Sequence, residues 1–206
     1  MKIGISIHGA AALKNAARQI ERYPAQSARA GQAAVNDVAS TVLTAASRDI
    51  SQRYNLPASY VREKFTLRPA TSSIDFAVIA ARKRGTRLAR FDANQMTASA
   101  PRAKGDTRRA IAKGRKQAGV SIKVKRQGAR QTLRHAFFLP LMAGKEAAGN
   151  GMGVFTREGG RLKHHYGISP SQAYAGWIRE HRPNISASLA KAYAARLQAE
   201  IRRGSK

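Results

Sequence analysis

The chain has 206 residues, of which 43% are hydrophobic and 6% aromatic, and it contains no cysteine. The length suits one domain with a modest core, and the missing cysteines exclude disulfides and thiolate metal sites and give no support for secretion. Lys and Arg number 38 against 11 Asp and Glu, for a formal net charge of +27. Such a charge indicates a polyanionic partner, typically a nucleic acid, with an acidic protein assembly as the alternative.

The N-terminal part of the chain predicts a short strand over residues 2–7, where polar and apolar residues alternate, and a helix over 9–22. These residues lack the continuous apolar run of a signal peptide. No stretch of the chain approaches the ~18 apolar residues of a transmembrane helix. We therefore expect no membrane partner.

One long helix is predicted over residues 25–53, because Val35, Val38 and Val42 recur at helical spacing on one stripe. A short helix over 57–64 follows, with proline at its first position. The long helix is rich in alanine, which permits other elements to approach it closely.

Alternating apolar residues predict an antiparallel sheet in the middle of the chain. Its strands are expected at 73–80, 120–128 and 133–142, followed by a hairpin of 154–158 and 162–168 around Gly159-Gly160. The intervening residues 92–118 show no clean period and are rich in small and basic residues, so they predict a long mobile loop.

The last element expected is a helix over 183–203, where Ile185, Leu189, Tyr193, Leu197 and Ile201 recur at four-residue steps. The order predicts an α+β fold, with long N-terminal helices packed on a small antiparallel β-sheet and a C-terminal helix. We expect a single domain over 1–206, composed of a mainly helical part (1–64), a sheet with its basic mobile loop (65–170) and the final helix (183–203).

Most of the excess charge lies between residues 82 and 134, where 17 Lys or Arg stand against Asp92 and Asp106. Aromatic residues are missing between Phe91 and Phe137, which disfavours base stacking and predicts phosphate contacts that do not read sequence. The alternative is a solvated loop that orders on a protein partner. The residues predicted to contact DNA or a partner are Arg82, Lys83, Arg84, Arg108, Arg109, Lys113, Arg115, Lys116, Lys123, Lys125, Arg157 and Arg161.

Two features resemble ligand sites but lack the required partners. The adjacent His164 and His165 point to opposite faces of a strand, and no His-x-His or Cys lies near them, so a metal site is not expected. The glycines at 149, 151 and 153 follow Lys145 and precede a strand. A phosphate-binding loop needs its lysine and hydroxyl after the glycines and ahead of a helix, so no nucleotide cofactor is expected.

Enzymatic chemistry is not supported either. Metal-dependent nucleases need clustered carboxylates, and no pair here has the spacing that would cluster them on a strand or helix. The carboxylates in the body of the chain are widely spaced, at Asp75, Asp92, Asp106, Glu146 and Glu158. Ser169 precedes a proline and lacks the glycines of a nucleophile elbow. We expect neither catalytic residues nor a cofactor.

Five segments carry a resemblance to a known family. They are AAVNDVAS (33–40), SQRYNLPASYVREKFTLRPAT (51–71), GVSIKVKRQGARQTLRHAFFLPL (119–141), GVFTREGGRL (153–162) and YGISPSQ (166–172). In this order the chain resembles the phage minor tail protein Z family of lambda-like phages and prophages. It departs from the family pattern at Ile168, which separates Gly167 from Ser169-Pro170, and in its long, basic 92–118 segment.

The resemblance implies a non-enzymatic virion component that acts in tail completion and head–tail joining, at the head-proximal tail end. It implies a homo-oligomer, a ring such as a hexamer, with the tail tube or tail terminator as partners and duplex DNA in non-specific contact. The expected location is the virion tail, and the host cytoplasm during assembly. The alternative is a general basic nucleic-acid-binding protein unrelated to tails, such as a chromosomal or RNA-binding module.

Overall fold

The structure is a computed structural model that describes residues 20–73, 75–107, 111–141 and 151–204. The strand expected at 2–7 and most of the helix expected at 9–22 lie outside these residues. The chain divides into two compact units, each described here by itself. The helical unit comprises residues 1–47, 62–82 and 173–206, and the sheet unit comprises 48–61 and 83–172. Within the described ranges, no helix has the length and apolar character needed to cross a membrane.

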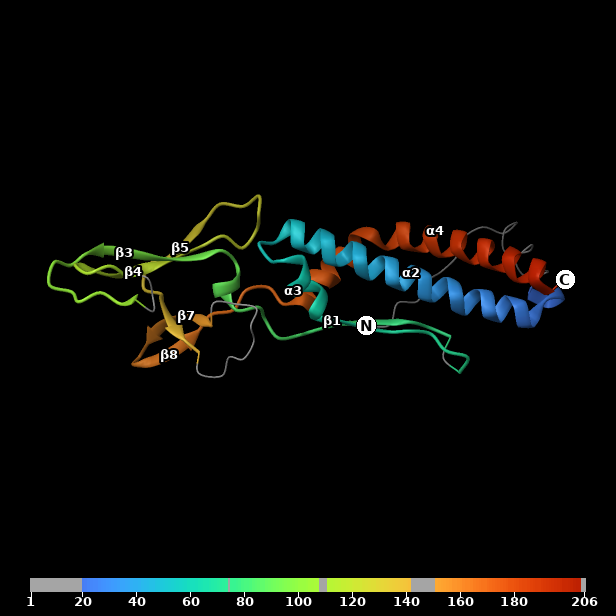
Figure 1. The fold of residues 1–206 in the computed structure, drawn as a ribbon, viewed down its shortest axis with the longest axis horizontal. Helices are drawn as coiled ribbons and strands as arrows, with labels where there is room; N and C mark the ends of the chain where they lie inside the picture. The colour runs from blue at the N-terminus through green and yellow to red at the C-terminus, as the bar shows by residue number, and fades with distance from the viewer. Residues whose placement is uncertain (1–19, 74, 108–110, 142–150, 205–206) are drawn as a thin grey trace. The chain divides into compact units, whose positions relative to one another are not determined.

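The predicted α+β class is confirmed, with a long N-terminal helix, antiparallel strands and a C-terminal helix (Figure 1). The helices are α2 (Pro24–Arg53), α3 (Ala58–Glu63), the short 3-10 turn η1 (Leu88–Arg90) and α4 (Pro170–Gly204). The strands are β1 (Phe65–Arg68), β2 (Val78–Ala81), β3 (Ala93–Ser99), β4 (Arg115–Ile122), β5 (Gln131–Leu133), β6 (Phe137–Pro140), β7 (Met152–Glu158) and β8 (Arg161–His164).

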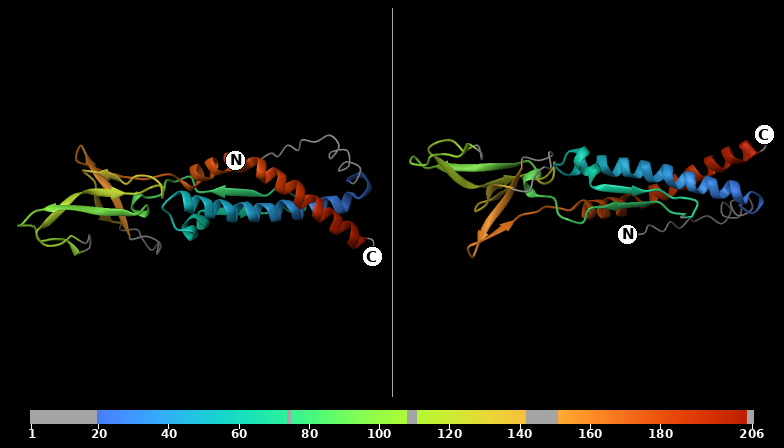
Figure 2. Two further views of the ribbon diagram at one scale, coloured as in Figure 1. Left: turned by 90° about the horizontal axis from the view of Figure 1, so that it is seen from above. Right: turned by 60° about the horizontal axis from the view of Figure 1, so that its bottom comes forward.

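In the helical unit, α2 and α4 run antiparallel beside each other (Figures 1 and 2). The most deeply buried residues of α2 include the alanines Ala30 and Ala34, each 0% exposed. At Gly31 an added Cβ would lie 3.9 Å from the ring of Tyr193 on α4. Small side chains therefore bring the two helices together. Of the predicted valine stripe, Val42 is buried, while the other two valines are only half-buried.

The C-terminal helix begins earlier than predicted, at Pro170 instead of residue 183. Ser169 and Gln172 form a capping box, in which the Gln172 amide donates to Ser169 Oγ (3.1 Å) and the Ser169 amide donates to Gln172 Oε1 (3.0 Å). Pro183 lies inside the helix. A proline there removes one backbone donor, which led the sequence prediction to start the helix at that point.

The predicted strand over 73–80 is shorter in the structure and begins at Val78. β2 pairs with β1 from Phe65↔Ala81 to Arg68↔Val78. The chain between them is held at Ala70, whose backbone amide donates to Asn36 Oδ1 on α2 (2.7 Å). The Ala70 carbonyl also accepts from Asn36 Nδ2 (3.1 Å). Both backbone groups of Ala70 are therefore occupied, and neither can pair with residues that precede Val78.

The sheet unit contains two three-stranded antiparallel sheets, with orders β3-β4-β5 and β6-β7-β8. Its core includes Phe91, Val120, Ile122, Phe138 and Val154, all at most 6% exposed. Val120 and Ile122 lie on β4, which begins earlier than the strand predicted over 120–128 and ends at Ile122. The predicted hairpin around Gly159-Gly160 is also confirmed, and both glycines take the positive φ that this turn needs. The strand expected over 133–142 is shorter in the structure: among its described residues, Leu133 ends β5 and Phe137–Pro140 form β6.

The prediction of a loop over 92–118 was wrong, because β3 and about half of β4 lie within these residues. The two strands pair from Ala93↔Ile122 to Ser99↔Arg115. A bulge between Gln95 and Thr97 shifts the register, and many strand residues are polar on both faces. These features remove the alternation that marks a strand in sequence. The mobility of the segment remains a prediction.

Candidate cationic interface

The chain beyond β3 and β4 continues as a hydrogen-bonded extension of their hairpin. Ala100 donates its amide to Gly114 O, and Gly114 donates to Ala103 O, both at 2.8 Å. Farther out, Asp106 and Ile111 exchange two backbone hydrogen bonds of 2.8 Å, and the Ile111 side chain is buried. We call residues 99–116, of which 108–110 are not described, the basic arm.

The basic arm presents exposed cations along its length. They are Arg102, Lys104, Lys113, Arg115 and Lys116. The Arg115 guanidinium is bound to its own hairpin, because Nε donates to Thr97 Oγ1 (2.7 Å) and a terminal nitrogen donates to Thr97 O (3.0 Å). Within the described ranges, no carboxylate pairs with any of the other four. Their charge is therefore available to an external anion.

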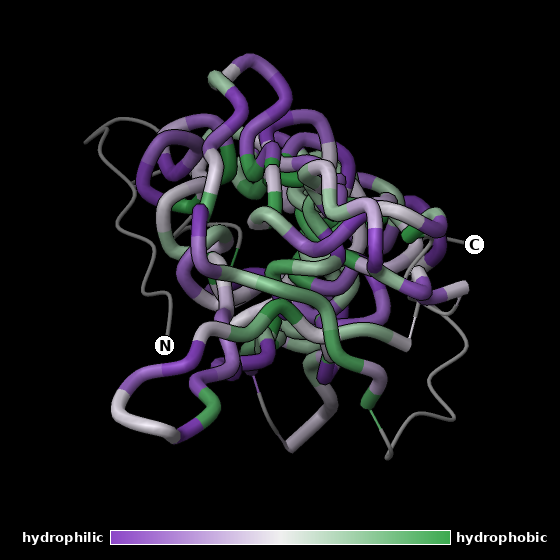
Figure 3. Tube along the Cα trace, turned by 90° about the vertical axis from the view of Figure 1, so that its left-hand side faces the viewer, coloured by the Kyte–Doolittle hydropathy of each residue, from purple (hydrophilic) through white to green (hydrophobic). Residues whose placement is uncertain are grey.

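A second basic segment follows β4. The exposed Lys125 and the half-buried Lys123 were both predicted contact residues. Arg126 next to them is bound to the end of α2, where Nε donates to Ser51 O (2.9 Å) and its amide donates to Arg53 O (3.1 Å). The turn between β4 and β5 is the hydrophilic loop at the top of Figure 3.

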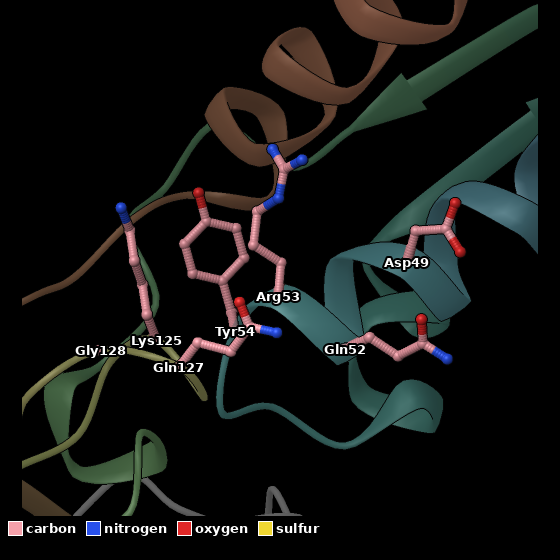
Figure 4. A pocket seen from close by; sticks show the side chains of 7 residues that line it. All are labelled: Asp49, Gln52, Arg53, Tyr54, Lys125, Gln127 and Gly128. Atoms are coloured by element: carbon pink, nitrogen blue, oxygen red, sulfur yellow. The ribbon is translucent and has the colours of Figure 1, made fainter.

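This turn borders a pocket of about 520 Å³ in the sheet unit. Figure 4 shows the polar ends of Arg53, Tyr54 and Lys125 pointing toward the same side. The complete lining is Asp49, Gln52, Arg53, Tyr54, Lys125, Gln127 and Gly128. Two cations and two amides make its character polar, although Arg53 and Asp49 both have other partners.

The remaining predicted residues lie on other elements. Arg157 and Arg161 are exposed at the β7–β8 turn, where Glu158 pairs with Lys163 at 3.1 Å. Lys83 and Arg84 are the first two residues of the 83–172 segment of the sheet unit, whereas Arg82 belongs to the helical unit. The predictions at 108 and 109, Arg108 and Arg109, lie outside the described residues.

The structure therefore brings only some predicted residues together. Lys113, Arg115 and Lys116 share the basic arm, and the others are distributed over the β4 exit, the β7–β8 turn and the 82–84 segment. The sequence prediction selected other cations of this segment and missed Arg102 and Lys104, because no sequence pattern places these two on a paired hairpin. The backbone pairing about Gly105 is the signal that places them on the arm.

The two histidines have separate partners in the structure. Thr156 Oγ1 lies 2.7 Å from His165 Nε2, whereas the His164 ring stacks on Phe155 with centroids 4.4 Å apart. Burial lowers the pKa of His164 from its ordinary value of 6.5, and the positive charges of Arg87, Arg84 and His165 lower it further. No group of three or more His, Asp or Glu suited to a metal occurs in the part of the chain that the structure describes.

Comparison with known proteins identifies the family. The model of the family described as prophage minor tail protein Z (GPZ) matches residues 10–203. The searches of curated proteins and of solved structures gave no match. The match spans both structural units and nearly the whole chain. The chain therefore belongs to the prophage minor tail protein Z family.

Proposed function

We propose that this phage minor tail protein is a non-enzymatic ring subunit that acts in tail completion and head–tail joining, at the head-proximal end of the tail. Its basic arm contacts the phosphates of duplex DNA without reading sequence. Family membership supports the tail assignment. The observation that carries the DNA contact is the hydrogen-bonded arm, with four exposed cations that no carboxylate neutralises within the described ranges.

The chemistry of the arm suits phosphate rather than base recognition. Duplex DNA carries one negative charge per about 1.7 Å of its axis, and Lys and Arg bind it by replacing condensed counterions. No residue between Ala93 and Ile122 is aromatic, so the arm has no ring on which a base can stack. Contacts of this kind hold the duplex without selecting a sequence.

The net charge bears on assembly as well. Identical subunits that each carry a formal charge of +27 repel one another, so a closed ring requires anions near its cationic surfaces. DNA passing through the ring and the tail tube or tail terminator at its face supply these anions. The proposed location is the virion tail, reached after assembly in the host cytoplasm.

A salt titration tests the DNA contact. Binding of the full chain to a fluorescent duplex of random sequence is measured at several salt concentrations. Four phosphate contacts contribute about −3.6 to the slope of log K against log salt. We expect the combined variant Arg102→Gln, Lys104→Gln, Lys113→Gln and Lys116→Gln to lose most of that contribution.

A matched control removes four exposed cations from the helical unit, which are Arg62, Arg68, Arg179 and Lys191. It is expected to change the slope much less than the arm variant. Equal slopes for the two variants would refute the assignment to the arm.

The tail function has a separate test. Purified tails made without this protein are expected to fail to join heads, and the added protein is expected to restore joining. The competing function is that of a general nucleic-acid-binding protein. A chain that stays monomeric alone and with tail tubes, yet binds duplex DNA tightly at physiological salt, would favour that competitor.

A further inference from the structure

The β6-β7-β8 sheet has two faces with different roles. Its inner face carries Val154 and Phe138, which are 0% and 6% exposed in the core. The register places another set of side chains on the opposite face, through the pairs Phe137↔Phe155, Phe155↔His164 and Arg157↔Leu162. We call this the outer face, and it comprises Phe137, Leu139, Phe155, Arg157, Leu162, His164 and, just beyond β8, Tyr166.

The outer face combines apolar exposure with charge at the β7–β8 turn. Leu162 is 50% exposed, and Arg157 beside it is also exposed. Figure 3 shows this turn at the lower left, as a mostly hydrophilic loop with one hydrophobic segment. Tyr166, at the other end of the face, is also exposed, by 39%, so apolar side chains and cations are exposed together at both ends of the outer face.

The other end of the outer face is a preformed stack. The His164 ring lies between Phe155 and Tyr166, with ring centroids 4.4 Å apart on each side. Tyr166 Oη lies 3.0 Å from His164 Nδ1, and a terminal nitrogen of Arg84 donates to the same hydroxyl at 3.1 Å. Gly153 permits this packing, because a Cβ there would lie 2.6 Å from the Phe155 ring.

The charges of this face are positive at both ends. Arg84 stands at the Tyr166 end and Arg157 at the Leu162 end. Glu158, the carboxylate nearest in sequence, points to the opposite face and pairs with Lys163. The lowered pKa of His164 agrees with this field, since Arg87 and Arg84 both contribute to it after burial.

Three kinds of occupant are conceivable for such a face, and the charges and rings favour one. A second copy would bring the same cations against themselves. A nucleic acid base needs an open ring face, but both faces of His164 are covered, and Arg84 lies over the Tyr166 ring with its guanidinium carbon 5.6 Å from the centroid. An acidic protein segment satisfies both the cations and the exposed leucine.

We propose that the outer face binds an extended acidic segment of a partner protein, with one carboxylate at Arg84 and, at the other end of the face, one carboxylate at Arg157 and an apolar side chain on the neighbouring Leu162. Residues 162 and 166 are separated by about 13 Å along an extended chain, at ~3.3 Å per residue. The two carboxylates therefore belong about four residues apart. This contact is independent of the DNA contact proposed for the basic arm.

The test uses the isotope-labelled full chain and a synthetic peptide, acetyl-Glu-Val-Leu-Val-Glu-amide, monitored by NMR. We expect shift changes centred on residues 153–166 that weaken as salt is added. Arg157→Gln or Leu162→Ser is expected to weaken binding by about threefold, the scale of an exposed ion pair or a small apolar contact. Both side chains are exposed, so the variants retain the fold.

The matched control is Arg161→Gln, which removes the same charge from the opposite face of β8. It is expected to leave the affinity within about 1.5-fold. The proposal is overturned if the control weakens binding as much as Arg157→Gln, or if a peptide with Lys in place of Glu binds equally well. It is also overturned if a short oligonucleotide displaces the peptide, or if dilution alone shifts the same signals, as self-association would.

Discussion

The helical unit and the sheet unit are built on opposite principles. The helical unit packs α2 against α4 through alanine and glycine, and it pairs Asp37 with Arg196 and Glu200 with Arg29. The sheet unit fills its core with aromatic and β-branched residues, and it leaves cations without carboxylate partners along the basic arm. We therefore place both proposed contacts, the basic arm and the outer face, on the sheet unit, and none of them on the helical unit.

The largest expected effect tests the bulky core of the sheet unit. Phe91 is 0% exposed, so Phe91→Ala removes a whole ring and is expected to cost about 3–5 kcal/mol of stability. Thermal melting followed by circular dichroism measures the loss. The matched control is Phe76→Ala in the helical unit, where the ring is 52% exposed and little change is expected. Similar losses in both variants would contradict this core assignment.

A glycine pair gives the next largest contrast. Gly119 has φ +117°, and an added Cβ would lie 2.7 Å from Leu133 O, a backbone atom that cannot yield cheaply. Gly119→Ala is therefore expected to cost about 3 kcal/mol in the sheet unit. Gly176 lies in α4 with open space around it, so Gly176→Ala is expected to stabilise by about 0.5–1 kcal/mol. Chemical denaturation of both variants checks the opposite signs.

The close-packed helices should resist enlargement. Ala34 is 0% exposed on α2, and Ala34→Leu is expected to cost about 1–3 kcal/mol by overpacking. The exposed Ala28 on the same helix provides the control, because Ala28→Leu meets solvent. A neutral Ala34→Leu variant in thermal melting would show that the helices do not meet through small residues.

A buried hydroxyl in the helical unit gives a smaller effect. Tyr174 is 4% exposed, and no described residue hydrogen-bonds its hydroxyl, so Tyr174→Phe is expected to stabilise by about 1 kcal/mol. Burial raises the pKa of Tyr174 from 10.0 to about 12. The stability that the neutral Tyr174 hydroxyl contributes is therefore fully present below pH 10 and is lost as the pH rises toward 12. In that window this hydroxyl ionises in the unfolded chain but not in the folded one. Melting at pH 9 and 11 should show this loss in the natural chain and not in the variant.

The smallest effect concerns the outer face of the sheet unit. Because the pKa of His164 is lowered below its ordinary 6.5, the unfolded chain gains a proton first as the pH falls. The stability due to neutral His164 is present above pH 6.5 and is lost below it. His164→Phe keeps a ring in the stack and should reduce the fall in melting temperature between pH 7.5 and 5. An unchanged fall would show that His164 does not titrate in this way.

Much of the fold could be predicted from the sequence where a local pattern is strong. The spacing in 25–53 predicted α2 to within one residue at its start, and Gly159-Gly160 between alternating segments predicted the β7–β8 hairpin. The start of α4 was missed because Pro183 masked the capping box at Ser169. The prediction gave more weight to Pro183, because proline usually interrupts a helix, than to the capping residue Ser169. The folded chain nevertheless accommodates Pro183 inside α4.

The candidate surfaces were harder to predict because they depend on pairing between strands. The basic arm is rich in small and basic residues, and its backbone hydrogen bonds are not accompanied by a hydrophobic period that the sequence would reveal. The outer face requires the register of β6, β7 and β8, which brings Phe155 beside His164. Composition indicated that cations matter, but only the strand pairing shows which of them share a surface.

Cryo-electron microscopy of intact phage tails, with this chain located in the density, tests the proposed function most directly. We expect a ring of this protein at the head-proximal end, with the basic arm directed toward the DNA channel. Density for the chain at the distal tail tip would contradict it.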